Sequence, residues 1–134
     1  MGQNFTIQNN DLGSVDLFGT EYESDIYNYS GPTEKVLPAG LILARDSVSG
    51  KLVDFVVGGV TNENGIPKVV LGREVTIPAS AGDVSLRVIV SGEVRRDRIF
   101  TLAFDPITDA IADQLRDYSI VARRNVDVSK LDNQ

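Results

Sequence analysis

Short β-favouring runs separated by clusters of turn-forming residues are the feature that most constrains what this sequence can fold into. In the clearest run, residues 84–90, one set of alternate positions is entirely apolar: Val84, Leu86, Val88 and Val90. Because side chains alternate across a strand, we expect these positions to share one face and to form part of the core. The other face carries Ser85, Arg87 and Ile89. The pattern predicts a strand with one buried face.

Several other runs have the same character. Residues 41–44 and 52–57 flank a group of turn formers that ends in Gly50, which predicts a hairpin. The Asn64-Gly65 pair can supply positive φ in the following loop, and Gly92 should turn or bulge the chain after the strand at 84–90. Further strands are expected at residues 68–71, 74–77, 99–104 and 119–122.

One helix is clearly indicated, over residues 106–118. Asp105 can cap its start, and Pro106 suits the first turn of a helix. The apolar positions fall on one face, which we expect to pack against the sheet: Ile107, Ile111, Leu115 and Tyr118.

Three carboxylates lie on the other side of this helix, at Asp109, Asp113 and Asp117. Their four-residue spacing could suggest a cation site. A solvated helix face is the better interpretation, because such a face normally carries charges and Arg116 can pair with Asp113.

The chain of 134 residues is long enough for one domain with one core. Its polar and apolar residues divide it into three parts. Residues 1–35 read as an N-terminal arm, residues 36–124 as a β-rich domain with the helix near 106–118, and residues 125–134 as a polar C-terminal tail. The predicted fold class is therefore mainly β with one α-helix and an extended N-terminal arm.

The arm is too apolar and aromatic to be an inert linker. One interpretation is a segment that orders on a partner surface, with Phe5-Thr6-Ile7 alternating as an added strand would. The other is that these residues pack back onto their own domain, and the sequence leaves both open. The candidate binding residues of the arm are Phe5, Thr6, Ile7, Leu12, Leu17, Phe18, Tyr22, Tyr27 and Tyr29.

Residue types needed for much of enzyme chemistry are missing. The sequence has no histidine and no cysteine, which excludes Ser-His-Asp and Cys-His catalysis and zinc sites built on these residues. Neither a Walker loop nor a G-x-G-x-x-G motif is present. We expect no enzyme activity, no catalytic residues, no cofactor and no metal, although a carboxylate pair in one cleft cannot be read from sequence spacing.

Charge and hydropathy also limit the partners. The net charge of −6 opposes general attraction to nucleic acid or to anionic membranes, and no apolar run is long enough to span a bilayer. Arginines cluster locally at Arg95-Arg96-Asp97-Arg98 and Arg123-Arg124. A charged strand end is preferred over a phosphate site for these clusters, because short basic patterns discriminate poorly.

From residue 37 onward the chain resembles the lambda-type head decoration proteins of tailed phages. The resemblance is carried by Leu37-Pro38-Ala39-Gly40-Leu41-Ile42-Leu43, Ser49-Gly50-Lys51-Leu52-Val53, the strand at 84–90, Ser91-Gly92-Glu93-Val94, and Asp117-Tyr118-Ser119-Ile120-Val121. It spans roughly residues 37–123. The longer segment before residue 36 and the acidic helix with its tail depart from the family pattern.

The resemblance implies a small β-barrel or β-tulip-like domain that binds the outside of an expanded head and stabilises it. It implies a homotrimer at local threefold positions, the major capsid protein as partner, and an arm that orders against capsid subunits. The expected location is the outer capsid surface of the virion, after synthesis in the host bacterial cytoplasm.

Two other roles stay open at this point. The chain could be another virion component, such as a part of a tail tube or connector, since a small β domain with an arm also suits that role. It could instead be a carbohydrate-binding module displayed on the particle, with Tyr22, Tyr27 and Tyr29 as stacking platforms.

Overall fold

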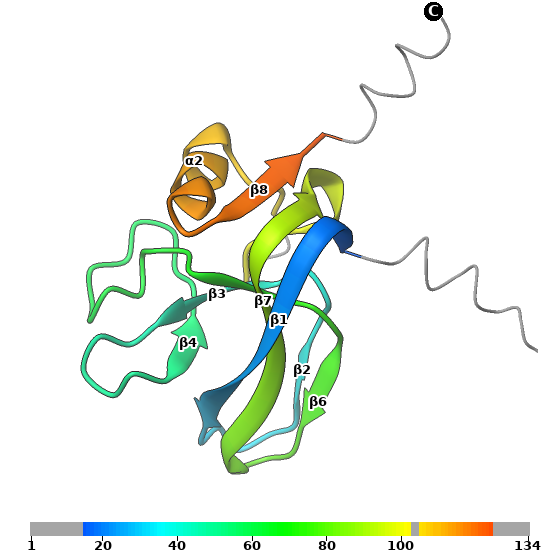
Figure 1. The fold of residues 1–134 in the computed structure, drawn as a ribbon. Helices are drawn as coiled ribbons and strands as arrows, with labels where there is room; N and C mark the ends of the chain where they lie inside the picture. Colours follow the sequence, from blue (N-terminus) through cyan, green and yellow to red (C-terminus); the bar gives the residue numbers. More distant parts are fainter. Residues whose placement is uncertain (1–14, 103–104, 125–134) are drawn as a thin grey trace, which may run out of the picture.

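The computed structural model describes residues 15–102 and 105–124. Figure 1 shows strands wrapped around a common interior, with one α-helix on the outside. In chain order the elements are β1 (Asp16–Tyr29), β2 (Lys35–Leu37), β3 (Ile42–Arg45), β4 (Leu52–Asp54), β5 (Val69–Leu71), β6 (Val75–Ile77), β7 (Gly82–Arg95), the short 3-10 helix η1 (Arg96–Arg98), α2 (Asp109–Asp117) and β8 (Ile120–Arg123).

The main sheet closes into a five-stranded barrel. Its strand order is β1-β4-β3-β5-β7-β8, and β1 also pairs with β7, so that β1, β4, β3, β5 and β7 form a ring. Strand β8 lies outside this ring, parallel to β7. The two short strands β2 and β6 pair with each other. The predicted fold class, mainly β with one α-helix and a barrel domain, is confirmed.

The interior of the barrel is filled by alternate side chains of its strands. Residues 86 and 88 of β7 are buried here, as the alternation predicted. Leu37 of β2 and Ile77 of β6 pack against the same layer. Leu41 joins this layer from just before β3, and the barrel strands contribute Tyr27, Leu43, Leu52, Val69, Leu71, Leu86 and Val88.

A second apolar layer covers the outside of the sheet. Helix α2 buries Ile111 and Leu115 there, over Ile42 and Ile89 of the strands beneath. The prediction of a single core face for residues 84–90 was therefore incomplete, because Ile89 is fully buried on the opposite face. The continuous apolar run at residues 41–44 has the same cause, since β3 is buried on both faces.

Strands β1 and β7 form a long antiparallel ribbon (Figure 1) that changes face near Gly92. The pairing has register shifts between Asp16 and Tyr22, and Gly92 adopts φ +111°. As a result Val94 joins the outer layer, although Leu86 and Val88, also at even positions, point inward. The predicted irregularity at Gly92 is present, but the strand continues to residue 95 without turning.

The folded domain starts earlier than the sequence analysis placed it. Residues 16–29 are not part of an arm before the domain: they form β1, which closes the barrel, and Val15 is already buried. Register shifts interrupt the alternation of β1 between Asp16 and Tyr22, and the regular part beyond Tyr22 carries exposed polar residues such as Glu23, Ser24 and Asn28, so the sequence pattern did not show a strand.

Three local predictions need correction. Helix α2 begins at Asp109 with Thr108 as its cap, because the Thr108 hydroxyl accepts a hydrogen bond from the Ile111 amide, whereas Asp105 and Pro106 precede the helix. Residues 99–102 form no strand and residues 103–104 lie outside the described part, so only the isolated bridges of Phe100 with Leu41 and with Pro106 remain there. In the loop before β5, Asn62 and Glu63 adopt positive φ in place of Asn64-Gly65.

Candidate binding surface

One face at the end of the β1–β7 ribbon is open and carries two arginines. Beyond Ile89, β7 pairs only with β1 and β8, so the ribbon extends past the barrel. Phe18 lies opposite Glu93, Glu93 is the partner of Val121, and Arg95 is the partner of Arg123. Because paired residues on neighbouring strands project from the same face, Glu93, Val121, Arg95 and Arg123 form one surface. The exposed Phe18, whose pairing with Glu93 is flanked by register shifts, lies at its edge, and we call these five residues the arginine face.

The reverse side of the same strands explains why the arginine face is left open. Val94, Ile120 and Ala122 pack into the outer apolar layer beneath α2. The helix therefore covers one side of this three-stranded end, and the arginine face is the other side. Phe18 is 74% exposed there, which is high for a large aromatic side chain.

The charges of the arginine face are only partly balanced. Arg123 Nε lies 2.8 Å from Glu93 Oε1, and this contact raises the pKa of the Arg123 guanidinium. The side chain of Arg123 nevertheless remains 57% exposed. Arg95 Nε is buried and has no hydrogen-bond partner among the described residues. A buried donor without an acceptor is unusual in a folded protein and costs free energy.

More arginines lie around the edge of this end. Arg96 and Arg124 both contact Oδ1 of Asp109, at 2.7 Å and 3.4 Å. The hydrogen bond and charge of Arg96, together with the charge of Arg124, lower the pKa of the Asp109 carboxyl. The two arginine clusters are evident in the sequence, but their meeting is not, because β7 and β8 pair in parallel across the intervening helix.

Both ends of the described chain attach here. The Arg95 amide donates a hydrogen bond of 2.8 Å to the Val15 carbonyl, and Arg95 is also the strand partner of Arg123. The first and last strands of the described chain, β1 and β8, therefore lie on either side of the same short stretch of β7 (Figure 1).

The predicted binding residues are distributed unequally over the structure. Phe5, Thr6, Ile7 and Leu12 lie outside the described residues, as does the polar tail at 125–134. Leu17, Phe18, Tyr22, Tyr27 and Tyr29 all lie on β1. Of these β1 residues, only Phe18 projects an exposed side chain from the arginine face, whereas Leu17 is half-buried.

The tyrosines of β1 are engaged within their own domain. Tyr27 is 3% exposed, and burial raises its pKa to about 12 despite the hydrogen bond from Lys35. Tyr29 donates to the Thr33 carbonyl, and the guanidinium of Arg87 lies 4.9 Å from the ring centre of Tyr22. Tyr22 and Tyr27 also pack in different apolar layers. The three rings do not form a common stacking platform for a sugar.

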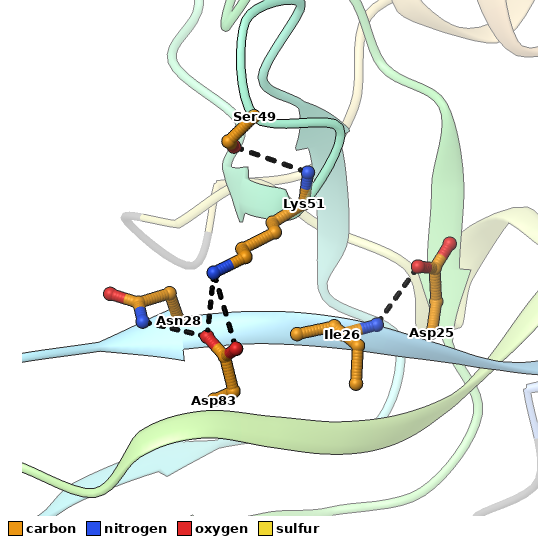
Figure 2. A network of polar contacts seen from close by, with 6 residues as sticks. All are labelled: Asp25, Ile26, Asn28, Ser49, Lys51 and Asp83. Carbon is orange, nitrogen blue, oxygen red and sulfur yellow. Dashed lines mark hydrogen bonds and ion pairs between the residues drawn. The ribbon is translucent and has the colours of Figure 1, made fainter.

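A polar network at the other end of the ribbon has a structural explanation. In Figure 2, Lys51 reaches from the β3–β4 turn to Asp83 at the start of β7, where its Nζ lies 3.0 Å from Oδ1. Asn28 of β1 donates to the same oxygen at 2.8 Å. These hydrogen bonds from Asn28 and Lys51 lower the pKa of Asp83. The network ties the turn to both strands and leaves its charges paired.

Two hollows in the described surface contain carboxylates, the residue type that a catalytic cleft would need here. The first has a volume of about 340 Å³ and is lined by Phe55, Val56, Val57, Thr101, Leu102 and Asp105, of which only Asp105 is a carboxylate. The second contains both Asp46 and Asp54. There, the two oxygens of Asp54 bind Tyr27 and Lys35, and Asp46 accepts a hydrogen bond from the Val48 amide. This second pair therefore has structural roles.

Comparison with known proteins adds no assignment. No family model matches this chain, and no curated protein and no solved structure matches it significantly. Within residues 15–102 and 105–124, no group of three or more acidic, histidine or cysteine side chains is placed to hold a metal ion. No helix in the same part of the chain has the length and apolar character needed to cross a membrane.

Proposed function

We propose that this protein is a capsid decoration protein, which binds the outside of an expanded phage head and stabilises it. Its partner is the major capsid protein, and it assembles as a homotrimer at local threefold positions. The proposal combines the sequence resemblance with a barrel fold of the kind that the resemblance implies. It includes no catalytic step.

The observation that carries the proposal is that the described chain begins and ends at the arginine face. A decoration protein has to present its shell contacts on one side. Here Phe18 and Arg123 lie on β1 and β8, the first and last strands of the described chain, and Arg95 lies on β7 between them. One end of the barrel can therefore bind the shell through a folded surface and through the arm.

The mechanism is stabilisation by mass action. A protein that binds only the expanded lattice favours that state by an amount set by its concentration relative to its dissociation constant. Many copies with modest individual affinity can together resist internal pressure. Within the arm, Phe5-Thr6-Ile7 would add a strand to a capsid subunit, and Leu12 would fill an apolar pocket.

The arm mechanism is tested by deleting residues 2–14 and measuring binding to expanded, undecorated heads by co-sedimentation. The deletion has to stop before Val15, because β1 belongs to the barrel. The matched control is a deletion of residues 126–134. We expect the first deletion to weaken binding by at least about tenfold, equivalent to about 1.4 kcal/mol, and the second to leave it within about threefold. Equal binding by both would contradict the arm mechanism.

A further inference from the structure

We infer that the arginine face is a carboxylate-binding site, which takes an acidic segment of a protein partner. The identification of that partner as a shell protein rests on the proposed function, but the affinity for carboxylates does not. The acceptor groups would be Asp or Glu side chains placed between Arg95 and Arg123.

The first argument is the number of unused donors. A guanidinium has five N–H donors, and in the described part of the chain Arg123 uses Nε for its ion pair with Glu93. Arg95 Nε has no acceptor in that part of the chain. Because the two residues are strand partners, their side chains project side by side from β7 and β8. A carboxylate between them would gain a charge-assisted contact with the exposed guanidinium of Arg123, and it would reach the buried Nε of Arg95 after a shift of the Arg95 side chain.

The second argument is the surroundings of these donors. Phe18 and Val121 provide apolar surface in the adjacent row of the same face. An exposed aromatic side chain beside arginines is a common composition for the centre of a protein interface. Burial of Phe18 by a partner would exclude water from the guanidinium–carboxylate contacts and strengthen them.

The third argument favours carboxylate over phosphate. The arginines at this end already bind carboxylates, in the pairs Arg123–Glu93 and Arg96–Asp109. The protein as a whole has a net charge of −6, which repels a polyanion such as nucleic acid more strongly than a short acidic segment. The site therefore fits a protein segment with few carboxylates.

The inference is tested on the full chain with a tetraglutamate peptide as the probe. The Nε–H resonances of the arginines are followed by nuclear magnetic resonance, with a tetraglutamine peptide as the neutral control at the same ionic strength. We expect saturable shifts for Arg95 and Arg123 with tetraglutamate alone. Arg73, an exposed arginine between β5 and β6, should not respond.

Variants assign the effect to this face. Arg123→Gln should weaken tetraglutamate binding by about tenfold, since a hydrogen bond to a charged group is lost. Phe18→Ser should weaken it less, and the control Arg73→Gln should leave it unchanged. Arg123 is 57% exposed, so its substitution spares the core. Arg123→Lys keeps the charge without the planar fork and should give an intermediate affinity.

Three results would overturn the inference. These are the absence of a saturable shift at Arg95 and Arg123, equal responses at Arg73, or wild-type affinity in Arg123→Gln. Tighter binding of inorganic phosphate than of tetraglutamate at equal ionic strength would assign the site to a phosphate-bearing ligand instead. If tetraglutamate binds as expected but the protein does not bind heads, the proposed function fails and the carboxylate site stands.

Discussion

The phenolic hydroxyl of Tyr27 donates a hydrogen bond of 2.7 Å to Oδ1 of Asp54. This contact lies where β1 and β4 close the barrel. The two described strands pair at one position, Tyr27 with Leu52. Lys35 of β2 completes the network, with Nζ 2.8 Å from the other Asp54 oxygen and 2.9 Å from the Tyr27 hydroxyl. Side-chain hydrogen bonds therefore reinforce the barrel where its backbone ladder is shortest.

Removing the central carboxylate should destabilise the domain. We expect Asp54→Ala to lower the free energy of unfolding by about 1.5–3 kcal/mol, because it removes the acceptor of the Tyr27 hydroxyl and the charged partner of the Lys35 ammonium. The exposed residue Asp97 provides the control, and Asp97→Ala should change stability by less than about 0.5 kcal/mol. Urea denaturation measures both. Similar values for the two variants would argue against a role for the network in closing the barrel.

The same network predicts alkaline sensitivity. Burial raises the pKa of Tyr27 to about 12 from 10.0. The protonated hydroxyl therefore contributes fully to the free energy of unfolding below pH 10, and this contribution is lost as the pH rises toward 12. Partial burial opposes the charged form of Lys35, but the hydrogen bonds that Lys35 donates to Asp54 and Tyr27 leave its pKa raised. Deprotonation of Lys35 at high pH therefore lowers stability as well. Urea denaturation at several alkaline pH values should show that the free energy of unfolding falls less steeply with pH for Tyr27→Phe than for the wild type. Parallel declines in the two proteins would contradict the assignment of the alkaline loss to Tyr27.

Helix α2 should be essential for covering the outer face of the sheet. Leu115 is fully buried, and Leu115→Ala should cost about 2–5 kcal/mol through the lost burial and the cavity that remains. Gln114 on the same helix is exposed, and Gln114→Ala should be within about 0.5 kcal/mol of the wild type. Thermal and urea unfolding provide the comparison. A small effect of Leu115→Ala would mean that the helix is not firmly packed on the barrel.

The close approach of β1 and β7 at Gly92 gives a backbone prediction. A Cβ atom added at Gly92 would lie 2.5 Å from the Cα atom of Thr20, in addition to the strain of a φ of +111°. Gly50 has a positive φ of +77° but open space around a Cβ atom. Gly50→Ala should therefore cost only about 1–2 kcal/mol, and Gly92→Ala should cost clearly more. Equal losses in urea denaturation would show that the backbones do not meet as closely as described.

The elements that were predicted well are those whose signal is local. The alternation at residues 84–90 predicted a strand, and the turn formers before Gly50 predicted a hairpin. Each signal lies within a few residues, and the structure contains both the strand β7 and the β3–β4 hairpin. Helix α2 was located by its apolar face, but its start was misplaced because Asp105 and Thr108 are both plausible caps and packing of the preceding segment decides between them.

The candidate site could not be built from the sequence because its parts meet only through long-range pairing. Phe18 reaches Glu93 by closure of the barrel, and Arg95 meets Arg123 through a parallel pairing that no turn signals. The bulges of β1 also hid the strand that carries Phe18. The residue types were recognised, whereas their convergence on one face was not.

The central claim is tested most directly by co-sedimentation of the purified full chain with undecorated expanded heads and with unexpanded precursor heads. We predict saturable binding to expanded heads and no binding to the precursors, because under the proposed function the arm and the arginine face bind subunit surfaces that meet only in the expanded lattice. Binding to neither particle, or self-assembly of the chain into rings or tubes without heads, would contradict the assignment as a decoration protein.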